Sequence, residues 1–158
     1  NADSGEKLAR VAMSAFCRGD GGFGGENRPG PAPAALPDRA PDHVCDIETL
    51  PRQALVYRLS GDMNPLHADP DVARSVGFDR PILHGLATYG LAARAILKSL
   101  LDYDAARLVG LDVRFSAPVY PGETVRFEIW EEGGEARFRA SIPARDVVVL
   151  NNGAARFA

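Results

Sequence analysis

Cysteine, basic charge and long apolar runs are all scarce in this sequence of 158 residues. Cys17 and Cys45 are too few for a disulfide framework and are spaced unlike metal ligands, so we expect free thiols and an intracellular protein. The 18 Lys and Arg residues do not outnumber the 21 Asp and Glu residues, which argues against a nucleic-acid-binding face. Arg94 and Lys98 interrupt the longest apolar run, so no membrane insertion is expected.

Histidine is also scarce, and two of the three histidines lie in one region with other polar groups. The first of them, His67, ends the segment 57–67, which reads Tyr-Arg-Leu-Ser-Gly-Asp-Met-Asn-Pro-Leu-His. Gly61 permits a tight turn in this segment, and Pro65 restrains the chain beyond the turn. The side chains of Asp62 and His67 can therefore point into one cleft.

Asp62 and His67 together suit the activation of one water molecule. At pH 7 an unperturbed Asp is charged and an unperturbed His is mostly neutral, so the pair can take a proton from water and return one. Asn64 can orient the pair or the water. These properties suit the addition of water to an activated double bond, or the reverse reaction. Two alternatives stay open: the segment is a structural turn, or Asp62, His67 and His84 bind a metal ion.

Gly85 is the candidate donor to the negative oxygen that develops during such a reaction. It follows His84 at the start of a long predicted helix, where the first amides have no intrahelical partner and the helix dipole is positive. Because Gly85 has no side chain, a carbonyl group can approach its amide closely. Base, water and oxyanion donor would then surround one carbonyl-conjugated substrate.

The periodicity of apolar residues predicts an α+β domain, in which one strand and a long helix precede a run of antiparallel strands. Helices are expected at 50–59, at 70–76 after a cap at Asp69, and from about 82 or 84 to 101. Strands are expected at 43–49, 108–115, 123–132, 135–142 and within 146–158. Gly133 and Gly134 predict a hairpin turn between two of these strands.

The long predicted helix is rich in alanine and glycine, and such small side chains let a sheet approach the helix axis closely. Its apolar stripe at helical spacing consists of Leu86, Gly90, Ala93, Leu97 and Leu100. In the strands, three aromatic side chains are expected in the core rather than on a base-stacking platform: Phe115, Phe127 and Phe138.

Segments 57–70 and 78–85 closely resemble the MaoC-like, (R)-specific enoyl-CoA hydratases. The most specific part is the pattern Asp-x-Asn-Pro-x-His at 62–67, and the likeness, which continues through 113–123 and 145–153, covers roughly residues 43–158. The resemblance implies a hotdog fold, an antiparallel β-sheet wrapped around a long central α-helix. It also implies hydration of trans-2-enoyl-CoA to (R)-3-hydroxyacyl-CoA, and the reverse dehydration, with no metal and no cofactor.

The resemblance implies a role for each candidate site residue. Asp62 and His67 would form the catalytic dyad on the water, Asn64 would support the loop, and the Gly85 amide would meet the thioester oxygen. Four further residues are expected to contact the substrate: His84, Arg114, Phe115 and Ser116.

Three parts of the chain are expected. Residues 8–18 alternate like a strand, and by the resemblance residues 1–18 are a remnant strand of a preceding hotdog half. Residues 19–42 form a Gly/Pro-rich linker and 43–158 the catalytic domain. The expected partners are an acyl-CoA thioester and either a second copy, giving a homodimer, or a non-catalytic hotdog half.

The location that goes with this assignment is cytoplasmic in a bacterium and peroxisomal in a eukaryote. Two alternative functions stay open. One is dehydration of a 3-hydroxyacyl thioester of acyl-carrier protein in fatty-acid or polyketide synthesis, and the other is a hotdog partner subunit without catalysis.

Overall fold

The computed structural model describes residues 1–15, 17, 19–25 and 35–158, in two units, Asn1–Ala32 and Pro33–Ala158. The sequence predicts a strand at 8–18, but the described residues of this range form no strand. None of the five described strands pairs with them. The described parts of the predicted linker, 19–25 and 35–42, contain no helix or strand, and 26–34 lie outside the described residues. The assignment of 1–18 as a remnant and of 19–42 as a linker stays a prediction.

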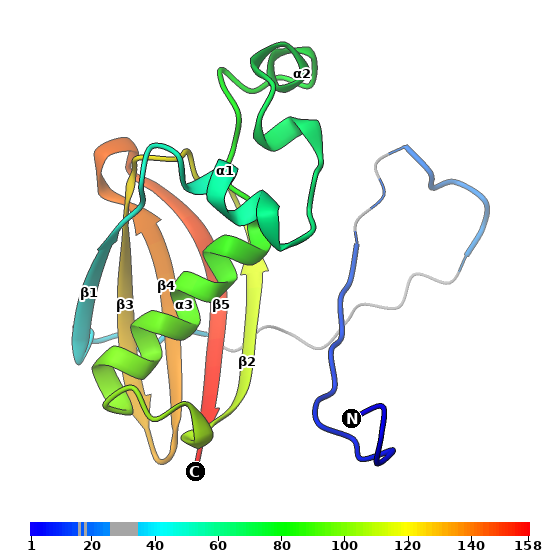
Figure 1. Cartoon of the computed structure of the whole chain (residues 1–158). Coiled ribbons are helices and arrows are strands. Elements are labelled where there is room, and N and C mark those ends of the chain that lie inside the picture. The colour runs from blue at the N-terminus through cyan, green and yellow to red at the C-terminus, as the bar shows by residue number, and fades with distance from the viewer. Residues whose placement is uncertain (16, 18, 26–34) are drawn as a thin grey trace. The chain divides into compact units, whose positions relative to one another are not determined.

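The second unit is built on one five-stranded antiparallel sheet with the strand order β1-β3-β4-β5-β2 (Figure 1). The strands are β1 His43–Glu48, β2 Leu108–Phe115, β3 Thr124–Glu132, β4 Glu135–Ile142 and β5 Val147–Phe157. Each strand lies where the alternation of the sequence predicts it. Since β1 and β2 are the outer strands of this order, each presents an edge without a neighbouring strand among the described residues.

The hairpin between β3 and β4 confirms the turn that the sequence predicts. Gly133 and Gly134 have φ angles of +54° and +86°, and two successive positive φ angles are the requirement of the favoured two-residue hairpin turn. This turn sets the register in which Ile129 lies opposite Phe138. Both side chains are fully buried, so the hairpin supplies the centre of the core.

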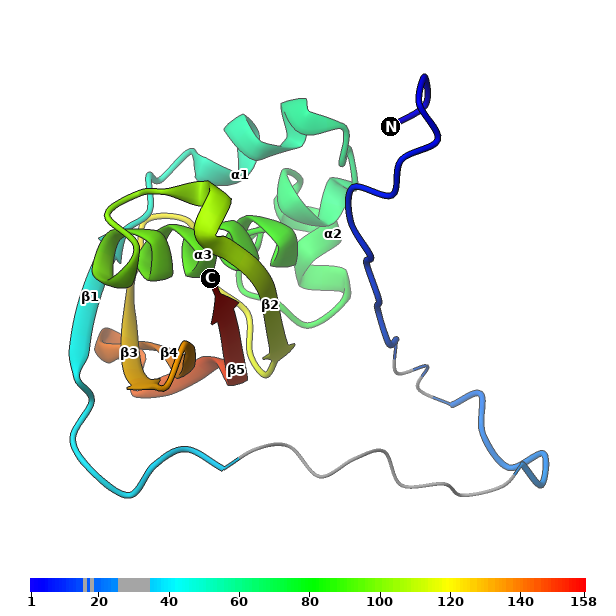
Figure 2. The same cartoon turned by 90° about the horizontal axis from the view of Figure 1, so that it is seen from below.

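Helix α3, Gly85–Leu100, lies along the sheet, and the sheet wraps around it (Figure 2). Its 16 residues extend about 24 Å at 1.5 Å per residue, long enough to cross several strands. A sheet wrapped around one long helix is the α+β hotdog arrangement that the resemblance implies. No helix within the described ranges is both long and apolar enough to cross a membrane.

The buried face of α3 differs from the predicted stripe. Leu86, the first residue of that stripe, is 61% exposed. The residues of α3 that are buried are Ala87, Thr88, Ala92, Ala95 and Ile96. Small side chains permit close contact between helix and sheet, and the fully buried face is rich in alanine. Leu97 and Leu100 of the predicted stripe are only partly buried and pack against the core.

Short helices carry the chain between β1 and α3. They are α1 Gln53–Tyr57, a 3-10 turn at Arg58–Ser60, a second 3-10 turn at Pro65–His67, and α2 Pro70–Ser75. Asp69 caps α2 as predicted, since its carboxylate accepts a hydrogen bond from the amide of Asp71 at 2.8 Å. Two more 3-10 turns, Ala105–Arg107 and Pro143–Arg145, precede β2 and β5.

The prediction that Phe115 lies in the core is wrong. Phe127 and Phe138 are fully buried as predicted, whereas Phe115 is 50% exposed. Phe115 is the last residue of the edge strand β2, and the pairing of β2 with β5 shifts its register between Asp112 and Arg114. An irregular edge strand does not keep strict alternation between core and solvent, so the two-residue period fails there.

Candidate active site

A tight loop between α1 and α2 carries Asp62 and His67. Gly61 has a φ of +113°, a conformation that favours glycine, and the chain then turns back on itself. The Asp62 carboxylate accepts a hydrogen bond from the Asn64 amide at 3.2 Å, and the Asn64 side-chain oxygen accepts one from the Leu66 amide at 3.0 Å. These two bonds shape the loop, and Asn64 in particular caps the 3-10 turn that ends at His67.

The hydrogen bonds of His67 determine which of its ring nitrogens is available. Its Nδ1 lies 2.8 Å from the main-chain oxygen of Ile82, and a carbonyl oxygen only accepts, so Nδ1 carries the proton. In the neutral ring Nε2 is then left with a free lone pair. The side chain is buried, and this buried ring has the protonation pattern of a general base.

His84 is even more deeply buried than His67 and lies directly against it. The two rings stack with their centroids 3.7 Å apart and their planes 26° from parallel. The Nε2 of His84 lies 3.2 Å from the main-chain oxygen of Asp62, whereas its Nδ1 is buried and has no hydrogen-bond partner among the residues that the structure describes. Burial lowers the pKa of His84, against an opposing effect of the hydrogen bond to Asp62.

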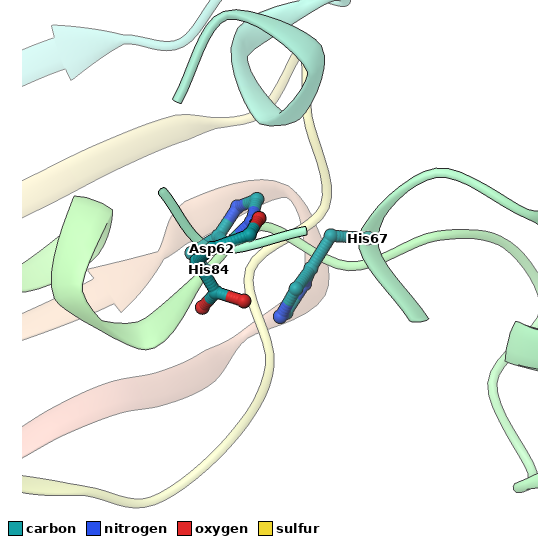
Figure 3. A group of neighbouring side chains, drawn as sticks. All are labelled: Asp62, His67 and His84. Atoms are coloured by element: carbon teal, nitrogen blue, oxygen red, sulfur yellow. The ribbon is translucent and has the colours of Figure 1, made fainter. Parts of the chain in front are cut away.

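The structure therefore brings Asp62, His67 and His84 to one place (Figure 3). One side-chain nitrogen or oxygen of each residue lies within 4.8 Å of those of the other two. Figure 3 shows the carboxylate of Asp62, which is exposed, directed toward the ring of His67. A carboxylate and an imidazole on one side of a small space can hold a single water molecule between them.

The same three residues fit a metal ion less well. A histidine lone pair lies in the plane of its ring, and a tetrahedral ion needs lone pairs that converge on one point. The rings of His67 and His84 are stacked nearly parallel, so their lone pairs run side by side instead of converging. The geometry favours the water-activating interpretation of the sequence over the metal-binding one.

Gly85 lies beside this group as the first residue of α3. Its amide belongs to the first helical turn, where amides lack intrahelical acceptors and the helix dipole is positive. A side chain at Gly85 would begin 3.4 Å from the ring of Phe115, so this ring of β2 adjoins the start of the helix. Phe115, one of the predicted substrate contacts, is thus close to the helix N-terminus.

The other predicted substrate contacts are placed less favourably. Ser116 donates its hydroxyl hydrogen to the main-chain oxygen of Val148 at 2.8 Å, so this hydrogen is already bonded within the protein. Arg114 is exposed on β2, opposite Asn151 in the register. His84 is 1% exposed, so its ring is enclosed by protein and contacts the loop of Asp62 instead of open solvent.

A pocket of about 170 Å³ lies next to His67. Its walls are mostly apolar and are formed by Pro51, Ala54, Leu55, His67, Ala68, Arg80, Pro81 and Pro121. Sequence reasoning did not anticipate this pocket, because its walls come from segments far apart in the chain. It also missed Tyr57, whose ring centroid lies 4.7 Å from that of His84, although Tyr57 begins the segment that the resemblance rests on.

Comparisons with known proteins agree with the fold and the site segment. The family model described as MaoC like domain matches residues 33–152. The chain is 47% identical over 140 residues to enoyl-CoA hydratase ChsH3 of Mycobacterium tuberculosis, which covers 89% of this chain and 49% of that protein. It is 46% identical over 149 residues to peroxisomal multifunctional enzyme type 2 of Mus musculus, covering 93% of this chain and 20% of that protein.

A solved structure of another protein supports the match to the MaoC like domain. The MaoC-like dehydratase of Phytophthora capsici matches with a TM-score of 0.83 and 45% identity, over 89% of this chain and 50% of that chain. The chain thus spans about half, or less, of the length of these relatives. The family match includes the loop of Asp62 and His67 together with all of α3. The chain belongs to the MaoC-like family and has its hotdog fold.

Proposed function

We propose that this chain carries the catalytic centre for hydration of trans-2-enoyl-CoA to (R)-3-hydroxyacyl-CoA, and for the reverse dehydration. The observation that carries the proposal is the meeting of the Asp62 carboxylate with the His67 ring, whose Nε2 has a free lone pair, beside the first turn of α3. The names of the relatives, enoyl-CoA hydratase and MaoC-like dehydratase, support the same reaction class.

The protons and electron pairs of the proposed reaction can be accounted for with Asp62, His67 and one water molecule. A water molecule held between Asp62 and His67 loses one proton to the pair, and its oxygen forms a bond to C3 of the substrate. The electrons of the C2–C3 double bond move onto the thioester oxygen as an enolate. The pair then returns a proton to C2, the enolate collapses, and one water has been added with no net change in protonation of the protein.

The enolate oxygen needs a hydrogen-bond donor, and we assign this role to the amide of Gly85. A preorganised amide of this kind contributes about 3–4 kcal/mol to lowering the barrier. The dipole of α3 adds a positive potential at the same place. A thioester bound with its oxygen at Gly85 would present C2 and C3 to the dyad, and this arrangement requires no redox cofactor.

A second hotdog unit is proposed as the partner of this chain. The edge strand β2 and the first turn of α3 expose apolar side chains, among them Leu86, Val109 and Phe115, each at least 50% exposed. An open sheet edge with exposed apolar residues is prone to associate, and a second hotdog unit offers a matching edge. Mass measurement in solution would distinguish a dimer of this chain from a monomer that needs a different half.

The test of the proposed function uses crotonyl-CoA and the purified chain. Hydration removes the conjugated double bond, so near-ultraviolet absorbance of the enoyl thioester falls, and chromatography on a chiral phase identifies the (R) product. Asp62→Asn and His67→Ala are each expected to keep the fold and to lose turnover by about 10²–10⁴-fold. Full activity in both variants would refute the assignment of the dyad.

A parallel assay with the same acyl group on acyl-carrier protein separates the two carriers at equal concentration. A preference for the CoA thioester supports the proposed substrate, and a preference for the protein-bound thioester replaces it. A chain that turns over neither carrier, alone or as a dimer, would point to a non-catalytic partner subunit.

A further inference from the structure

His84 occupies the point at which the three parts of the proposed site meet. Its main-chain oxygen accepts hydrogen bonds from the amides of Ala87 at 3.1 Å and Thr88 at 3.2 Å, so it begins α3 immediately before Gly85. Its Nε2 contacts the main-chain oxygen of Asp62, and its ring stacks on His67. One side chain therefore connects the carboxylate loop, the imidazole and the helix start.

The chemical form of His84 follows from its partners. The main-chain oxygen of Asp62 only accepts hydrogen bonds, so the proton of the ring lies on Nε2. A charged ring would also carry a proton on Nδ1, which is buried and finds no hydrogen-bond acceptor in the described part of the chain. Burial lowers the pKa of His84, and the nearby positive end of α3 disfavours a charged ring as well.

A neutral His84 is compatible with a proton transfer at the neighbouring ring of His67 during the proposed reaction. Two charged imidazoles with ring centroids 3.7 Å apart would repel each other, whereas one charged ring tolerates a neutral one beside it. His84 can therefore hold His67 by stacking while His67 takes or returns a proton.

We propose that His84 is a positioning residue, which holds Asp62 and His67 opposite each other through one hydrogen bond and one ring stack. This inference rests on the proposed function, because it assigns a role with respect to the same dyad. It differs from the substrate contact that the sequence predicts for His84, since the ring is enclosed and touches both members of the dyad.

Two substitutions separate the hydrogen bond from the ring stack. The side-chain NH₂ group of Gln in His84→Gln occupies a position comparable to Nε2, so this variant keeps a donor to Asp62 and loses the ring. His84→Phe keeps a ring for stacking and loses the donor. His84→Ala loses both interactions, and all three leave the main chain of the helix start in place.

Turnover of crotonyl-CoA is expected to fall about 10²-fold in His84→Ala, because small displacements of catalytic groups have effects of this size. His84→Gln and His84→Phe should each recover part of the loss, and KM should change by less than about threefold in all of them. A kcat within twofold of wild type in His84→Ala would overturn the inference. So would equal losses in all three variants, since neither contact would then matter.

Loss of stability alone must be separated from loss of positioning. Ile96→Val removes one methylene from the buried face of α3, far along the helix from Gly85, and serves as a control whose unfolding temperature is lowered without a change at the site. Each variant is assayed well below its own unfolding temperature. If Ile96→Val loses as much kcat as the His84 variants at the same distance from unfolding, the inference is wrong.

A double-mutant comparison tests whether His84 acts through Asp62. In the Asp62→Asn background, His84→Phe should reduce the residual kcat by much less than it does in the wild type, because the group that it positions is already disabled. Independent, multiplicative losses would contradict a positioning role.

The tautomer of His84 provides a readout that does not depend on activity. Long-range ¹H–¹⁵N correlation at pH 7 should show a neutral ring with its proton on Nε2, and a charged ring or the Nδ1–H form would overturn the inference. A wild-type chain without hydratase activity would refute the proposed function itself. An active wild type whose His84→Ala variant is unaffected would refute only the positioning role.

Discussion

The Nδ1 of His67 lies 2.8 Å from the main-chain oxygen of Ile82, and this contact determines which ring nitrogen of the imidazole is available to accept a proton. With the proton held on Nδ1, the lone pair of Nε2 stays free on a ring that is otherwise buried. In the proposed reaction, this hydrogen bond holds the neutral ring of His67 in one tautomer before it accepts a proton. The carbonyl of Ile82 thus affects the site through the main chain, independently of the identity of the residue.

Two substitutions of His67 should separate the contact with Ile82 from the chemistry. His67→Asn places an NH₂ group near the position of Nδ1 and keeps a donor to Ile82, whereas His67→Phe removes it. Both are expected to lose at least about 10²-fold in kcat. His67→Phe should in addition be less stable by about 1–3 kcal/mol, because a buried carbonyl is left without its donor. Urea unfolding of the two variants checks this, and equal stabilities would contradict the assigned hydrogen bond.

Replacing Gly85 with alanine should impair activity without harming the fold. The new methyl group would lie 3.4 Å from the ring of Phe115, an ordinary packing distance, so the free energy of unfolding should change little. The methyl group would nevertheless crowd a thioester oxygen that approaches the Gly85 amide, and kcat/KM should fall by at least about tenfold. Gly90→Ala is the matched control on the same helix, because no atom of the described residues lies within 4 Å of its methyl position. Wild-type kcat/KM in Gly85→Ala would remove Gly85 from the site.

The stability of the domain should decrease as the pH falls below the ordinary histidine value of 6.5, and His84 should cause part of this decrease. Its pKa is lowered in the folded state by burial, so below pH 6.5 the unfolded chain binds a proton that the folded chain resists. The contribution is complete above pH 6.5 and is lost as the pH falls toward the folded pKa. Urea unfolding between pH 7 and pH 5 should show a shallower pH dependence in His84→Phe than in wild type.

The two carboxylates whose pKa values are lowered, Asp42 and Asp46, act in a more acidic range than His84. The hydrogen bonds from Arg39 and Arg126 lower the pKa values of Asp42 and Asp46 below their ordinary value of 3.8. Their contributions are therefore present above pH 3.8 and are lost only as the pH falls below it. An unchanged slope between pH 7 and pH 5 in His84→Phe would show that His84 is not kept neutral by the fold.

Gly153 should not tolerate a side chain. A methyl group there would lie 2.5 Å from the main-chain oxygen of Phe138 and 2.7 Å from its ring, in the pair formed by β4 and β5. Gly153→Ala must therefore shift a fully buried ring or the strand itself, and we expect a loss of about 1–3 kcal/mol in the free energy of unfolding. Gly90→Ala, in open space on α3, should be neutral or stabilising by up to about 1 kcal/mol. A stable Gly153→Ala would mean that this close contact is not present in solution.

Local patterns in the sequence were sufficient for most elements of the sheet domain and for the proximity of Asp62 and His67. Period-two alternation located the five strands of the sheet, although it also predicted a strand at 8–18 that the described part of this range does not form. Two adjacent glycines located the hairpin, and Asp69 before Pro70 located a helix start. Asp62 and His67 are five residues apart on a loop bent by Gly61, so a short-range turn was enough to bring them together. Such features depend on neighbours in the chain, and the sequence by itself determines them.

Tertiary structure alone decided which surfaces meet. A helix of alanines and leucines offers several apolar faces, and only the folded chain shows that the face with Ala92 and Ile96 is the fully buried one. The exposure of Phe115 followed from its place on an irregular edge strand. The contacts of His67 with Ile82 and of His84 with Asp62 use main-chain oxygens, which every residue has and no motif marks, so the protonation pattern of the site could be read only from the folded chain.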